Sequence, residues 1–63
     1  MERTLKHPER GVNKISREGD VVAVYGPSSE VLDAKVFRTE LTAKSYETFL
    51  LHYHADLGYK PYG

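Results

Sequence analysis

The spacing of the hydrophobic residues changes once along this chain, near Thr42, and that change constrains the fold more than any other feature. Before Thr42 the apolar residues alternate with polar ones or form short β-branched runs, as strands do. After it they recur at spacings of three and four, the period of an amphipathic helix. The residues of this helical stripe are Ala43, Tyr46, Leu50, Tyr53 and Leu57, with Phe49 on one margin. The pattern predicts an α+β fold with strands first and one helix last.

Two segments ahead of this change are predicted to form a hairpin. Residues 12–17 (VNKISR) are the first strand, and Gly19 just beyond them can supply the positive φ of a tight turn. Residues 21–26 (VVAVYG) are the second strand, because four of the six are β-branched or aromatic.

Residues 31–39 (VLDAKVFRT) support two interpretations. Their alternation places Leu32, Ala34 and Val36 on one face of a third strand, which is the favoured structure. A helix beginning at residues 28–29 is the alternative, because apolar residues here also recur at spacings of three and four.

The ends of the C-terminal helix carry recognisable signals. Thr39 or Thr42 can cap its start, and Glu40 and Lys44 are in the favourable i,i+4 order. Gly58 is placed to end the helix, since glycine readily adopts the left-handed conformation just past a helix terminus.

The simplest assembly is a three-stranded antiparallel β-meander with one C-terminal amphipathic helix packed on one face. A β-hairpin followed by two helices is the alternative. Residues 1–11 are expected to be a flexible N-terminal arm, because only Leu5 anchors them after Met1. Residues 12–58 are expected to form a single small α+β domain, and residues 59–63 a C-terminal tail.

Composition excludes several classes of protein. The 63 residues carry nine Lys and Arg against nine Asp and Glu, so no net charge draws the chain toward nucleic acid or an anionic membrane. The absence of cysteine removes disulfides and thiolate chemistry. No apolar run approaches the ~20 residues of a membrane helix, and the charged start lacks the apolar core of a secretory signal. We therefore expect a cytoplasmic protein with no membrane partner.

The two histidines of FLLHYH (residues 49–54) suggest a metal site that a helix cannot build. Residues two apart on a helix differ by about 200°, so His52 and His54 cannot both reach one ion. His52 and Asp56 share a face, but zinc requires three or four ligands, so we expect a solvated surface pair. We expect no metal and no cofactor. The chain also lacks a nucleophile elbow and a phosphate loop, and we expect that it is not an enzyme.

The remaining hypothesis is binding. If Leu32, Ala34 and Val36 face the helix, Phe37 lies on the open face of the sheet, where an aromatic ring can anchor a protein partner. The predicted partner-binding residues are Tyr25, Lys35, Phe37, Leu51 and His54. Leu51 lies off the helical stripe and could pack on a twin subunit, which makes a homodimer an alternative arrangement.

These patterns predict a small non-enzymatic binding or regulatory protein that acts on a larger protein. An inhibitor or modulator encoded by a phage or prophage is one such chain. The alternative is a module that binds RNA or single-stranded nucleic acid on an open sheet face, with stacking on Phe37. Its basic residues would be Arg10, Lys14, Arg17, Lys35 and Arg38.

Overall fold

The computed structural model describes residues 1–62 of the chain as one antiparallel sheet and one helix. The elements are β1 (Glu2–His7), β2 (Gly11–Glu18), β3 (Val21–Tyr25), β4 (Val31–Val36), α1 (Glu40–Leu57) and β5 (Lys60–Pro61). Of the expected tail 59–63, Gly63 lies outside the described residues.

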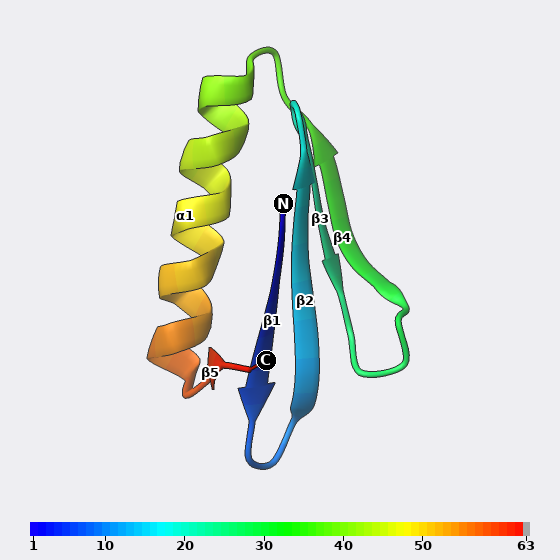
Figure 1. Cartoon of the computed structure of the whole chain (residues 1–63), viewed down its shortest axis with the longest axis vertical. Coiled ribbons are helices and arrows are strands. Elements are labelled where there is room, and N and C mark those ends of the chain that lie inside the picture. Colours follow the sequence, from blue (N-terminus) through cyan, green and yellow to red (C-terminus); the bar gives the residue numbers. More distant parts are fainter. Residues whose placement is uncertain (63) are drawn as a thin grey trace.

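The five strands lie in the order β4-β3-β2-β1-β5, and every neighbouring pair is antiparallel. The α1 helix lies along one face of this sheet, and the chain then returns beside β1 (Figure 1). The other face of the sheet is open, as the sequence predicted. The α+β class and the single C-terminal helix are confirmed.

The expected number of three strands is wrong. The N-terminal segment that we expected to be an arm contains β1, which pairs with β2 from Glu2 opposite Ser16 to His7 opposite Gly11. The C-terminal segment contributes β5, whose Pro61 lies opposite Leu5. Leu5 is the buried residue of β1, and this one anchor is too small a signal for sequence patterns to detect a strand.

The turns and helix ends follow local sequence. Gly19, with φ of +61°, occupies the first position of a two-residue hairpin loop between β2 and β3, where glycine meets no steric penalty. The Thr39 hydroxyl accepts a hydrogen bond from the backbone N–H of Thr42 at 3.1 Å and caps α1. Gly58, with φ of +104°, ends the helix.

The hydrophobic core lies between α1 and the central strands. Ile15 on β2 and Val22 on β3 are completely covered at its centre. Burying such side chains stabilises a fold by roughly 1.5–3 kcal/mol each. The buried apolar residues are Leu5, Ile15, Val22, Val24, Ala43, Leu50 and Tyr59.

The expectation that the even-numbered residues of β4 face the helix is wrong. Val24 is buried under α1 and lies directly opposite Asp33. Because directly opposed residues share a face of the sheet, Asp33 and Lys35 lie on the helix side, and Ala34 and Val36 lie on the open side. The helix side of this strand carries its two charged residues, which contact Tyr46 on α1, so the apolar alternation pointed to the wrong face.

Phe37 is therefore not on the open face. It is half-buried on the helix side, with its ring centroid 5.1 Å from that of Tyr46. The predicted stacking platform of Phe37 on the open sheet is absent from the described residues.

Candidate interaction surfaces

The α1 helix buries a different stripe from the one its sequence predicts. Its buried residues are Ala43, Glu47, Leu50 and His54. At 100° per residue, this stripe is centred about 50° from the predicted one. Two of its four positions are polar, and the rotation leaves Phe49 and Tyr53 exposed.

The first polar position is held by an ion pair between helix and sheet. Arg17 Nε on β2 donates to Glu47 Oε1 on α1 at 3.0 Å, and Arg17 Nη1 donates to the carbonyl of Gly19 at 3.1 Å. The two side chains are only 11% and 8% exposed. Glu47 Oε2 is buried without a hydrogen-bond partner among residues 1–62. Because turning Glu47 away would leave Arg17 buried and unpaired, the pair fixes which side of α1 faces the sheet.

The second polar position is His54, which we predicted to contact a partner. It is buried instead. Its Nδ1 lies 2.8 Å from the carbonyl oxygen of Leu50, which can only accept, so Nδ1 carries the proton. Nε2 then accepts from Asn13 Nδ2 at 3.3 Å. Both nitrogens are used inside the chain, so His54 presents no polar atom to a partner.

Tyr59 continues this cluster toward the end of the helix. Its ring lies between those of His54 and His7, with centroid separations of 4.9 and 5.1 Å. His7 Nε2 donates to the carbonyl of Leu57 at 3.1 Å, which satisfies one carbonyl of the last helical turn. These contacts join β1, α1 and the C-terminal segment.

The rotation of α1 creates a surface that we call the aromatic flank, composed of Phe37, Tyr46, Phe49 and Tyr53. Successive ring centroids are 5.1, 6.0 and 6.1 Å apart, so the four rings form a continuous row. Phe49 is 57% exposed and Tyr53 is 51% exposed. A contiguous row of aromatic rings, two of them exposed, is typical of a surface that another molecule covers.

Tyr46 connects this flank to β4. Its hydroxyl donates to Asp33 Oδ2 at 2.8 Å, and Lys35 Nζ lies 4.9 Å from its ring centroid. Burial, followed by the hydrogen bond to the Asp33 carboxylate, raises the pKa of the Tyr46 phenol above its usual value of about 10. The Tyr46 side chain thus holds the side chains of Asp33 and Lys35 on the helix side of β4.

A second surface is a groove of about 390 Å³ on the opposite flank of α1, between the helix and the β1–β5 edge. Leu51 and Ala55 form its helical wall. The lining residues are Arg3, Thr4, Leu5, Leu51, Ala55, Tyr59, Pro61 and Tyr62. The groove is mainly apolar, with Arg3 as its charged member.

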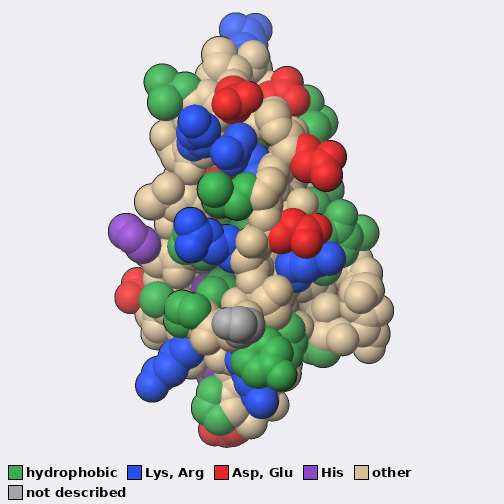
Figure 2. Space-filling view, viewed as in Figure 1, with side chains coloured by type: hydrophobic (Ala, Val, Ile, Leu, Met, Phe, Trp, Pro, Cys, Tyr) green, Lys and Arg blue, Asp and Glu red, His purple; other side chains and the backbone are tan. Residues whose placement is uncertain are grey.

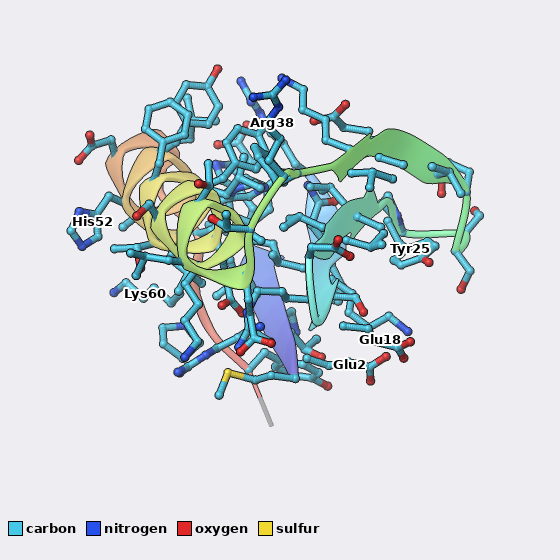
Figure 3. The ribbon with its side chains drawn as sticks, turned by 90° about the horizontal axis from the view of Figure 1, so that it is seen from above. Glu2, Glu18, Tyr25, Arg38, His52 and Lys60 are labelled. Carbon is cyan, nitrogen blue, oxygen red and sulfur yellow. The ribbon has the colours of Figure 1, made fainter. Side chains whose placement is uncertain are left out.

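The open face of the sheet is the third surface. Tyr25 lies on it, directly opposite Val31, and Lys14 Nζ is 5.1 Å from its ring centroid. In Figure 3, Tyr25 and Glu18 lie on the side of the sheet away from α1.

The structure disperses the five predicted partner-binding residues over these surfaces. Tyr25 is on the open face, Leu51 is in the groove, and His54 is buried. Only Lys35 and Phe37 come together, beside Tyr46 on the aromatic flank.

The predicted basic residues are dispersed as well. Arg17 is partly buried and paired with Glu47, whereas Lys14 contacts Glu2 at 3.6 Å and the Tyr25 ring on the open face. Arg38 follows β4 on the opposite side of the molecule from Glu18 (Figure 3). Acidic and basic side chains both occur across the face shown in Figure 2. No continuous basic surface is formed by these residues.

Sequence reasoning missed Phe49 and Tyr53 as surface residues because it assigned them to the core or its margin. The decisive contact joins Arg17 to Glu47 across 30 positions of sequence, and periodicity carries no information about such a pair. Glu47 next to an otherwise apolar stripe is the one local signal that the helix could be rotated.

Comparison of the chain with protein-family models, with curated proteins and with solved structures finds no match. No helix among residues 1–62 is long and apolar enough to cross a membrane. The described residues contain no group of three or more His, Cys, Asp or Glu side chains placed to hold a metal ion.

Proposed function

We propose that this chain is a small non-enzymatic binding protein that regulates a larger protein by covering part of its surface with the aromatic flank. One observation carries the proposal: α1 buries Glu47 and His54 while it leaves Phe49 and Tyr53 in water. Aromatic side chains dominate the energetics of protein interfaces because they bury a large area at a small cost in conformational entropy.

The orientation of the helix supports this function because α1 also carries a more apolar stripe that does not face the sheet. A rotation of about 50° would place the predicted stripe against the sheet. Burying an ion pair is often no more stabilising than burying apolar residues of similar size. The Arg17–Glu47 pair therefore sets how α1 is turned on the sheet. In that orientation the aromatic flank is exposed.

A protein is favoured over a nucleic acid as the partner because of charge. The chain has no net charge, and one of its predicted basic residues, Arg17, is neutralised internally by Glu47. Nucleic-acid binding depends on several cations that release counterions together. The aromatic flank has Lys35 beside Asp33 and thus no excess of positive charge at its centre.

The test is capture of a partner from lysate of the source organism, followed by affinity measurement with the purified partner. The double variant Phe49→Ser/Tyr53→Ser removes both exposed rings. Leu41→Ser is the control, because Leu41 is an exposed apolar residue of α1 (75% exposed) outside the aromatic flank.

We expect the double variant to bind the captured protein at least about tenfold more weakly, since truncating one interface anchor typically costs more than ~1 kcal/mol. Leu41→Ser should bind as the unmodified chain does. If every captured protein binds the double variant with unchanged affinity, the proposed function of the flank is wrong.

A further inference from the structure

The free edge of β4 carries a second and independent inference. The sheet ends at β4 on one side and at β5 on the other. β5 has two residues, one of which is Pro61 without an N–H, so it is a poor template for another strand. β4 has six residues (Val31–Val36) with neither proline nor glycine. Such an edge offers unpaired backbone groups to an incoming strand.

One hydrogen bond between β3 and β4 shows which backbone groups of β4 are free. Phe37 N donates to the carbonyl of Asp20 at 2.9 Å, in register with the β3–β4 ladder. Because hydrogen-bonded and non-hydrogen-bonded pairs alternate in an antiparallel ladder, the backbone of Lys35 also bonds to β3. The N–H and C=O groups of Ala34 and Val36 then point away from β3, toward the open edge.

The side chains of β4 are complementary to a second β4 running in the opposite direction. With Ala34 opposite Ala34 of the second copy, Asp33 lies opposite Lys35, and Lys35 lies opposite Asp33. Leu32, the extra residue of a β-bulge in β4, lies next to Val36 of the second copy, and both are exposed apolar residues. Opposite charges placed across an antiparallel pair are stabilising, whereas like charges are destabilising. In this register, a two-fold axis at Ala34 pairs each Asp33 with a Lys35 and brings each Leu32 against a Val36.

The charged side chains are already held where this pairing needs them. Asp33 accepts from the Tyr46 hydroxyl at 2.8 Å, and Lys35 lies over the Tyr46 ring. Both therefore lie on the helix side of β4, and directly opposed residues of two paired strands share a face. Less side-chain freedom is lost on association when the groups are ordered beforehand.

We infer that two copies of this chain associate through β4, antiparallel and centred on Ala34, to form one continuous ten-stranded sheet. A lysine on an edge strand usually deters pairing. Here Asp33 of the second copy neutralises Lys35, so the edge accepts its own sequence and disfavours strands that lack an acidic residue in that register. The inference does not depend on a role for Phe49 or Tyr53.

The first measurement is the mass of the unmodified chain by sedimentation equilibrium across a wide range of concentration. We expect a reversible increase from 7.2 kDa toward twice that mass. A mass that stays at 7.2 kDa up to millimolar concentration would overturn the inference.

The second measurement uses charge variants. Lys35→Asp makes the strand acidic at both positions, Asp33→Lys makes it basic at both, and each should self-associate at least about tenfold more weakly than the unmodified chain. Lys60→Asp makes the same change of charge on β5, at the other edge of the sheet, and should leave self-association unchanged. Circular dichroism checks that each variant is folded.

An equimolar mixture of the acidic and basic variants should regain the dimer, because each Asp then lies opposite a Lys. If the chain dimerises but the mixture is no stronger than either variant alone, the interface is elsewhere, for example on the open sheet face, and the inference is wrong.

Hydrogen exchange tests the edge without any substitution. The amides of Ala34 and Val36 should exchange more slowly as protein concentration rises, whereas the amide of Lys35 should be protected at every concentration. Exchange of Ala34 and Val36 that is independent of concentration, in a sample shown to be dimeric, would also overturn the inference.

Discussion

Replacing Glu47 with alanine should destabilise the fold far more than its surface chemistry suggests. The substitution leaves the Arg17 side chain, which is 11% exposed, without its carboxylate partner. Removing one member of a buried ion pair typically costs about 3–5 kcal/mol, because the remaining charge stays out of water. A chain of this length has a total stability of roughly 3–9 kcal/mol, taken at about 0.05–0.15 kcal/mol per residue. Glu47→Ala therefore removes a large part of the stability of the fold.

The assay is urea unfolding followed by circular dichroism of α1. Glu40→Ala is the matched control: it also removes a helical glutamate from an ion pair, with Lys44 at 3.9 Å, but both of those side chains are more than half exposed. That control should cost less than about 1 kcal/mol. The double variant Arg17→Met/Glu47→Leu should recover most or all of the loss, since it leaves no unpaired charge. Equal costs for Glu47→Ala and Glu40→Ala would refute the reasoning.

Three further outcomes are expected. The pKa of Tyr46 is raised in the folded state. The stability that the protonated phenol contributes is therefore complete below its unfolded-state pKa of about 10, and it is lost as pH rises through the folded-state pKa. Tyr46→Phe should therefore flatten the alkaline loss of stability measured by urea unfolding. Asn13→Ala should cost about 1–3 kcal/mol in the same assay, because His54 Nε2 loses its donor while buried. Gly58→Ala should lower the melting temperature, since its φ of +104° strains any residue with a Cβ.

Each of these outcomes has a clear contradiction. An alkaline titration unchanged in Tyr46→Phe would mean that another group causes the loss of stability. A cost below about 0.5 kcal/mol for Asn13→Ala would mean that water replaces the amide. An unchanged melting temperature for Gly58→Ala would mean that the helix end can relax without strain.

The elements whose form depends on near neighbours could be predicted from sequence. The hairpin turn at Gly19, the cap at Thr39 and the end of the helix at Gly58 are each decided within a few residues. Residues 31–36 were correctly favoured as a strand over a helix. β1 and β5 could not be predicted, because a segment with one buried residue becomes a strand only when a neighbouring strand supplies its hydrogen bonds.

The candidate site depended on information that periodicity does not contain. The sequence by itself determined that an amphipathic helix would cover one face of an antiparallel sheet, because hydrophobic spacing sets which residues can share a face. Only the tertiary structure decided how that helix is turned. Arg17 and Asn13 on β2 hold Glu47 and His54 against the sheet, since buried polar groups must find partners, and those partners lie far away in the sequence. That choice is what leaves Phe49 and Tyr53 exposed to a second molecule.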